Sequence, residues 1–160
     1  MLATAEIHKT GLVPRSRIDD LHAAMAQLPQ APGMDTEHFF IGGMYCRRIR
    51  IPAGTAIVSK VHKTEHLFIG CQGELKIVGQ GATYTLRPGD VVPSAIGTKR
   101  AVYALSDVVC LTIHKTDLTS TEHLEEELME EDELSLYDVN NQPKCGVLVV
   151  DVKEDGKWLG

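Results

Sequence analysis

The chain has 160 residues, 43% of them hydrophobic, which is enough to build the core of one ordinary domain. A net charge of -6 argues against a general nucleic-acid binder, because such proteins use lysine and arginine to displace counterions from the phosphate backbone. No apolar run approaches the ~20 residues of a membrane span, and no secretory signal is visible. The four cysteines are far apart, so we expect reduced thiols and a cytoplasmic protein. Together, these features predict neither nucleic-acid nor membrane partners.

Residues 1–38 are expected to form a helix and a loop packed on the following domain. Ser16 and Asp19 form an S-x-x-D capping box, which is typical of a helix start. An amphipathic helix is predicted to end before Pro29, with its apolar side packed on the domain or on a second subunit; this side comprises Ile18, Leu21, Met25 and Leu28. Two prolines and a glycine predict a loop over residues 29–38.

From residue 39 to residue 116 the sequence changes to short runs rich in valine, isoleucine, tyrosine and threonine, separated by glycine turns. The runs are IGGMYCRRIRI, TAIVSKVH, HLFIGC, ELKIVG, ATYTL, DVV, RAVYAL and VVCLTIH. Regularly spaced short strands with tight turns indicate an antiparallel sandwich or barrel, and no helix-length pattern interrupts them.

Residues 117–160 are expected to form an acidic helix and a C-terminal strand. Thr119 and Glu122 make a second capping box, and EHLEEELMEEDEL follows with Leu124 and Leu128 four residues apart. We interpret its charge run as a solvated face rather than a metal site or a site for a basic partner. CGVLVVDV, residues 145–152, is apolar on both faces and should add a strand to its own barrel or to that of a second subunit.

The stretch GTAIVSKVHKTEHLFIGCQG, residues 54–73, carries the most distinctive chemistry. In an extended chain Lys60, His62 and, if the strand continues, His66 would share one face. Two imidazoles do not complete a zinc site, which usually needs at least three protein ligands. The alternative is a pair of half-exposed histidines on a hairpin.

This stretch resembles the first motif of the cupin family, in which two glycines enclose His-x-His and a following Glu. Gly54 and Gly73 take the glycine positions, and His62 takes the second histidine position. Lys60 stands at the first metal-binding histidine and His66 at the glutamate.

RPGDVVPSAIGTKR, residues 87–100, is similar to the second cupin motif. Gly89, Asp90 and Gly97 match, Pro93 is displaced from the usual proline, and Arg100 stands at the third metal-binding histidine. The resemblance, over residues 43–114, implies an antiparallel jelly-roll barrel with one short helix on each side. Small proteins with HKxEH followed by GTKR also resemble cupin-like products of tailed phages and prophages, which would place the chain in a host cytoplasm.

Three functions remain open at this point. A cupin-like protein could bind an anionic or polar small molecule in the barrel mouth without a full metal site, because losing metal ligands to lysine and arginine turns a cation site into an anion site. A phage-type structural or interaction protein would retain only a vestigial pocket. A metal-dependent enzyme of dioxygenase, isomerase or lyase type would need a divalent transition metal on His62 and His66.

We favour the first function and leave open whether it includes catalysis, with no cofactor predicted. The expected ligand-binding residues are Lys60, His62, His66 and Arg100, with Arg100 the main anion contact and the histidines supplying pH-sensitive hydrogen bonds. His114 ends its strand and is expected to lie ~20 Å from this site, so it is not counted as a ligand. The surplus apolar surface of the first helix and the C-terminal run, together with the cupin resemblance, predicts a homodimer.

Overall fold

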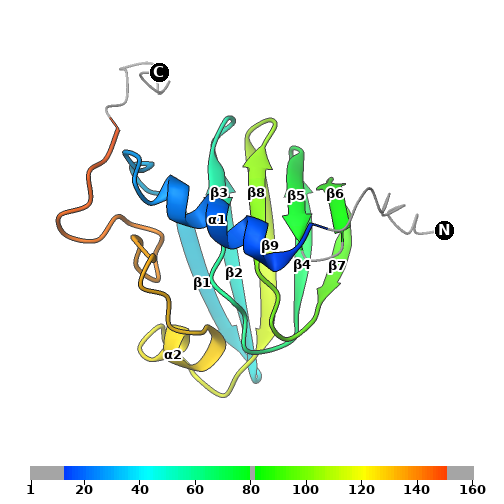
Figure 1. Cartoon of the computed structure of the whole chain (residues 1–160). Coiled ribbons are helices and arrows are strands. Elements are labelled where there is room, and N and C mark those ends of the chain that lie inside the picture. The colour runs from blue at the N-terminus through cyan, green and yellow to red at the C-terminus, as the bar shows by residue number, and fades with distance from the viewer. Residues whose placement is uncertain (1–12, 80–81, 151–160) are drawn as a thin grey trace.

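The computed structural model describes residues 13–79 and 82–150, and this part of the chain is mainly β, with two antiparallel sheets and two short helices (Figure 1). The elements in chain order are α1 (Arg15–Met25), β1 (Thr36–Ile41), β2 (Met44–Ile51), β3 (Ala56–Val58), β4 (His66–Gln72), β5 (Leu75–Gly79), β6 (Ala82–Leu86), β7 (Val91–Ser94), β8 (Arg100–Ala104), β9 (Val108–Lys115) and α2 (Leu124–Leu128).

The strands form a jelly-roll sandwich. One sheet has five strands in the order β1-β2-β9-β4-β7, and the other has four in the order β3-β8-β5-β6. The chain therefore alternates between the sheets, and β9 lies between β2 and β4, which precede it by many residues. This arrangement confirms the antiparallel sandwich or barrel that strand periodicity and turn residues indicate, and the jelly roll that the cupin resemblance implies.

The core fills the space between the two sheets. Alternate residues of each strand point inward, as in Val108–Lys115, where every second side chain is buried. The principal cluster of buried residues comprises Met34, Ile49, Ile51, Phe68, Leu75, Ile77, Leu86, Ala104, Val108 and Cys110. Pro93 lies in β7, an edge strand, where a residue without an amide hydrogen is tolerated.

The motif glycines occupy turns that require left-handed backbone. Gly73 has φ +71°, and a Cβ there would lie 2.1 Å from the carbonyl oxygen of Asp107. Gly97 has φ +82° and makes the turn between β7 and β8. Only glycine adopts such backbone angles without strain. The glycine turns predicted from the sequence are therefore turns that connect strands of the barrel.

Two boundaries of the predicted barrel differ from those observed. β1 begins at Thr36, inside the predicted loop, because Thr36 to His38 pair with the inner strand β2. β3 ends at Val58, so Lys60, His62 and His66 do not lie along one strand. Tertiary pairing, which local turn residues do not report, decides both boundaries.

Neither predicted capping box forms. α1 has Pro14 at its N-cap and α2 has His123, with no side-chain cap hydrogen bond at either. Pro14 suits the position because its missing amide hydrogen would have no partner there. Asp19 instead binds Arg15 and, at 2.8 Å, the buried Lys99 of the barrel.

The last part of the chain is less regular than predicted. α2 has five residues, and Met129 after it forms a bridge to His62, which ends the helix early. Residues 145–150 join neither sheet and make one parallel bridge, Val149 to Gln30, while residues 151 and 152 of the predicted strand lie outside the described residues. Neither described helix is long and apolar enough to cross a membrane.

Candidate functional site

The inner face of the five-stranded sheet carries a row of polar and aromatic side chains. Antiparallel pairing sets His66 of β4 directly opposite His114 of β9, and His114 opposite Tyr45 of β2. On the other side of His66, Ser94 of β7 is its partner. Directly paired residues have neighbouring side chains on the same face, so register alone brings these four groups together in the barrel interior.

His62 reaches the same place from the segment between β3 and β4. Its amide donates to the Thr98 carbonyl at 3.0 Å, and its carbonyl accepts from the Gly97 amide at 2.8 Å. Its Nδ1 lies 3.1 Å from the Thr98 carbonyl oxygen, so Nδ1 carries the hydrogen and Nε2 is free to accept. The turn aligned with the second cupin motif therefore holds His62 in place.

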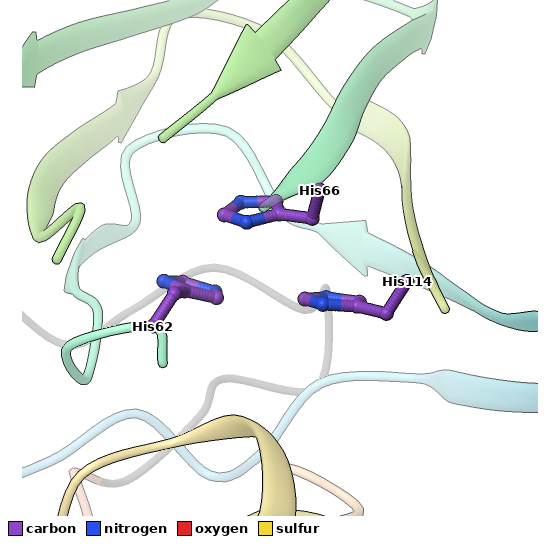
Figure 2. A group of neighbouring side chains, drawn as sticks. All are labelled: His62, His66 and His114. Atoms are coloured by element: carbon purple, nitrogen blue, oxygen red, sulfur yellow. The ribbon is translucent and has the colours of Figure 1, made fainter. Parts of the chain in front are cut away.

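The three imidazoles form a compact cluster (Figure 2), with one candidate ligand nitrogen from each within 4.8 Å of the others. The ring centroids of His62 and His66 are 4.1 Å apart, and those of His66 and His114 are 4.7 Å apart. All three residues are buried, with exposed fractions of 5% or less. We call this group, His62, His66 and His114, the histidine cluster.

The expectation that His114 lies far from the site is wrong. It assumed that the end of the last barrel strand pairs with the start of the strand that leads to His62. That strand, β3, belongs to the four-stranded sheet and pairs with β8, whereas β9 pairs with β4, whose first residue is His66. The sequence shows His114 as a third histidine in a predicted strand, but only the sheet topology shows that it lies beside His66.

Burial keeps the histidine cluster uncharged. It lowers the pKa of His62 to about 2, of His66 to about 4 and of His114 to about 3. Neighbouring charge adds to this effect, because Arg100 and Arg47 disfavour a further positive charge. The histidines are therefore neutral near pH 7. They do not change charge near neutral pH, as the predicted pH-sensitive hydrogen bonds would require.

Arg100 lies beside the cluster as a buried cation. It is 6% exposed, its Nη2 donates to the Ser94 hydroxyl oxygen at 2.6 Å, and its guanidinium lies over the Phe68 ring at 4.8 Å from the centroid. The same Nη2 is 3.4 Å from His66 Nε2. These partners are neutral, and no carboxylate among the described residues forms an ion pair with it.

A second guanidinium, that of Arg47, lies near the cluster, beside His114. Arg47 of β2 pairs in register with Thr112 of β9, and both side chains point inward. Buried polar atoms normally have hydrogen-bond partners. Here a group of buried atoms around the cavity has no protein partner: Arg47 Nε, Thr112 Oγ1, Thr55 Oγ1, His62 Nε2 and His114 Nδ1.

Lys60 also lies at the site, but its charge is already paired. Its Nζ donates to Glu125 Oε1 of α2 at 2.9 Å, and the Lys60 side chain is 21% exposed. The ion pair links the segment before His62 to α2. Lys60 is thus less available to an added anion than Arg100 or Arg47.

A cavity of about 390 Å³ connects these groups, and Lys60, His62, His66 and Arg100 all line it. Part of its lining is apolar, including Ile49, Ile51, Phe68, Leu75 and Val102, and several residues between 129 and 141 also line it. His114 lines a small adjoining space of about 20 Å³ together with Arg47 and Thr112. A volume of this size suits a small organic molecule, since ligand pockets typically hold ~300 to 1,000 Å³.

The histidine cluster meets only part of what a transition metal requires. Three buried neutral imidazoles are suitable donors, and two have an unpartnered nitrogen. However, the rings are stacked with interplanar angles of 10° to 25°, so their in-plane lone pairs do not converge on one point. A tetrahedral ion would need ligand nitrogens about 3.3 Å apart, and Arg47 and Arg100 would repel it.

The sequence matches no protein-family model and no curated protein. Solved structures similar to the chain include the DMSP lyase DddQ from Ruegeria pomeroyi, with 18% identity and a TM-score of 0.48 over 55% of this chain. A cupin superfamily protein from Desulfitobacterium hafniense has 15% identity and a TM-score of 0.47 over 58%. KdgF from a Halomonas species has 15% identity and a TM-score of 0.49 over 57%.

The strand order of the two sheets is that of an antiparallel jelly roll. The chain covers 49% of the DddQ chain, 88% of the Desulfitobacterium protein and 87% of KdgF. At these identities and TM-scores the likeness says nothing about the activity of this chain. The cavity and its lining residues are the features of this jelly roll that bear on its chemistry.

Proposed function

We propose that the chain binds a small anionic molecule in the cavity, with Arg100 and Arg47 as its cationic contacts. The observation that carries this proposal is the burial of Arg100 among neutral partners. Moving a cation out of water is costly unless an opposite charge compensates for it. An anionic group beside Arg100 would supply that compensation and could accept two parallel hydrogen bonds from the guanidinium.

The polar atoms around the cavity support the same ligand. Thr112 Oγ1 and Arg47 Nε can donate hydrogen bonds, and both lack protein partners. The neutral imidazoles can donate or accept without adding charge. Since their pKa values lie at about 2, 4 and 3, they are weak bases near pH 7, which supports binding rather than proton transfer.

The apolar part of the wall favours a ligand with a hydrocarbon body. Phe68, Leu75 and Val102 offer contact area that a bare inorganic anion would not use. Burying a ring or short chain there gains roughly 25 cal/mol for each Å² removed from water. An aromatic or aliphatic carboxylic acid should therefore bind more tightly than acetate or inorganic phosphate.

Calorimetric titration with benzoate, acetate and inorganic phosphate tests this proposal. Benzoate should bind most tightly, and Arg100→Met should weaken its binding at least about 30-fold, because truncating one partner of a buried charge pair costs ~2 to 5 kcal/mol. Arg87→Met is the matched control, since Arg87 is 60% exposed and paired with Glu74 outside the cavity. Equal benzoate affinity in wild type and Arg100→Met would rule the proposal out.

A second candidate function, favoured by the histidine cluster, is binding of a divalent transition metal. His62, His66 and His114 would hold the ion after rotation of the stacked rings, and a bound ion would supply Lewis-acid chemistry to a ligand in the cavity. Elemental analysis of protein purified without a metal-affinity column tests this candidate. One zinc, iron, manganese or nickel ion per chain, lost in His114→Gln, would favour it over a metal-free cavity.

A further inference from the structure

The cavity lining carries negative as well as positive charge. Its described residues include three carboxylates: Glu125, Asp132 and Asp138. Glu125 is paired with Lys60. Asp138 is exposed, and its Oδ1 accepts two amide hydrogens within its own turn. Asp132 remains, with a side chain that is only 14% exposed.

Asp132 differs from its neighbours in the acidic run, which the sequence suggested to be a solvated face. Glu131 and Glu133 are exposed, whereas Asp132 lines the cavity. Its Oδ1 accepts the Leu134 amide hydrogen at 2.9 Å. Its Oδ2 lies 3.6 Å from His22 Nδ1 of α1, which is too long for a hydrogen bond. No lysine or arginine among the described residues forms an ion pair with it.

His22 presents an unpartnered nitrogen beside this carboxylate. Its side chain is 12% exposed, and Nδ1 is buried without a hydrogen-bond partner. Burial lowers the pKa of His22 below its ordinary value, although Asp132 acts in the opposite direction. The imidazole is therefore neutral near pH 7 and does not compensate the Asp132 charge. Lys99 also lies near His22, but its Nζ already donates to Asp19 at 2.8 Å.

We propose that the ligand of the cavity is an amino-carboxylic acid, with its carboxylate at Arg100 and its ammonium group at Asp132. This ligand class rests on the proposed function, since its carboxylate contact is the one proposed for Arg100. An ammonium group has several hydrogens to donate, and the tautomer of His22 with its hydrogen on Nε2 offers an Nδ1 lone pair as a second acceptor. Because Asp132 Oδ2 and His22 Nδ1 are 3.6 Å apart, one nitrogen can lie ~2.9 Å from both and donate to each.

The two uncompensated charges favour a zwitterion over a simple carboxylate. Arg100 is 6% exposed, and the Asp132 side chain has little more contact with water. A simple carboxylate would compensate Arg100 but leave Asp132 without a partner, and an unpaired charge that is largely buried is costly. A dicarboxylate would add repulsion at Asp132. An amino-carboxylic acid pairs with both charges, and its hydrocarbon part contacts the apolar lining.

Calorimetric titration at pH 7 with isosteric pairs of ligands tests the ammonium contact. The pairs are 4-aminobutanoate with pentanoate, 6-aminohexanoate with heptanoate, and 4-(aminomethyl)benzoate with 4-ethylbenzoate. In each pair a methyl group replaces the ammonium group, and the three pairs differ in the separation of the two ends. Wild type should bind the amino member of at least one pair at least about 10-fold more tightly than its isostere, as expected of a hydrogen bond to a charged group.

A matched pair of variants assigns this preference to one carboxylate. Asp132→Asn keeps an oxygen for the Leu134 amide but removes the charge, so the preference for the amino ligand should disappear. Glu133→Gln removes one charge from the exposed neighbour outside the cavity lining and should keep the preference.

The outcomes separate this ligand class from the carboxylate site on which it rests. Equal affinity within every pair in wild type, a measurement that needs no variant to fold, would overturn the ammonium contact and leave the Arg100 site standing. A preference undiminished in Asp132→Asn would overturn it as well. If none of these ligands binds to wild type, the proposed carboxylate site fails together with the ammonium contact.

Discussion

At the scale of single residues, Arg100 is expected to favour ligand binding at the expense of the stability of the ligand-free fold. Its guanidinium is buried beside Ser94, Phe68 and His66, none of which carries a compensating negative charge. Burial also lowers its pKa, which is the expected direction for a cation removed from water. The residue thus lowers the stability of the ligand-free chain while preparing the cavity for an anion.

We therefore predict that Arg100→Met leaves the free energy of unfolding within about 1 kcal/mol of wild type, or raises it, although binding is lost. Replacing a buried ion by an apolar side chain of similar volume is often neutral or stabilising. Urea denaturation of the ligand-free proteins measures this difference. A loss of more than ~3 kcal/mol would mean that Arg100 belongs to the stabilising core rather than to a binding site.

The histidine cluster makes stability depend on pH. The folded-state pKa values of about 2, 4 and 3 lie below the ordinary histidine pKa near ~6.5, so the unfolded chain binds more protons once the pH falls below that value. The free energy of unfolding has its full value above pH ~6.5. As the pH drops from there towards 4, it should fall by up to ~1.4 kcal/mol per pH unit for each histidine.

Urea denaturation of EDTA-treated protein between pH 7 and 4 would measure this slope. The variant His62→Gln/His114→Gln should show a shallower slope than wild type, because it lacks two of the three groups. His123→Gln is the matched control, since the His123 side chain is 63% exposed. Identical slopes in all three proteins would show that the cluster is not buried in its neutral form.

At the scale of elements, α2 closes the barrel next to the site. Leu124 and Leu128 are buried against Tyr45, and the Leu128 carbonyl accepts a hydrogen bond from the Lys63 amide at 2.8 Å. The following residue, Met129, bridges to His62. The short helix therefore packs on the same segment that carries a member of the histidine cluster.

Truncation of this contact should loosen both packing and binding. Leu128→Ala is expected to destabilise the fold by ~2 to 5 kcal/mol, the usual range for a buried leucine, and to weaken benzoate binding by displacing His62. Leu148→Ala, at a residue that is 71% exposed, should change stability by less than ~0.5 kcal/mol. Thermal denaturation with and without benzoate measures both effects, and equal losses in the two variants would contradict this role for α2.

The same elements show what the sequence could predict. Strand alternation and glycine turns, which are local signals in the chain, indicated an antiparallel sandwich or barrel, and the motif resemblance implied the jelly roll. The start of β1 and the end of β3 were predicted at the wrong residues, because strand pairing across the sheets determines these boundaries. His114 was missed for the same reason: its neighbour His66 is 48 positions away in sequence, and only the β4 to β9 register brings them together.

At the scale of the whole molecule, the two faces of the five-stranded sheet carry different kinds of side chain. The inner face holds His66, His114, Arg47 and Thr112 around the cavity, and the outer face of β9 carries Leu111 and Ile113. Because successive side chains of a strand point to opposite faces, residues of β2, β4 and β9 lie alternately on the inner and the outer face.

The most direct test of anion binding is a crystal structure of the full chain grown with 4-bromobenzoate, with anomalous data for bromine and for transition metals. We predict a carboxylate within hydrogen-bond distance of the Arg100 guanidinium, and bromine against the apolar wall that includes Phe68 and Leu75. Bromine outside the cavity, or an ion on His62, His66 and His114 with no bromobenzoate at Arg100, would contradict the account.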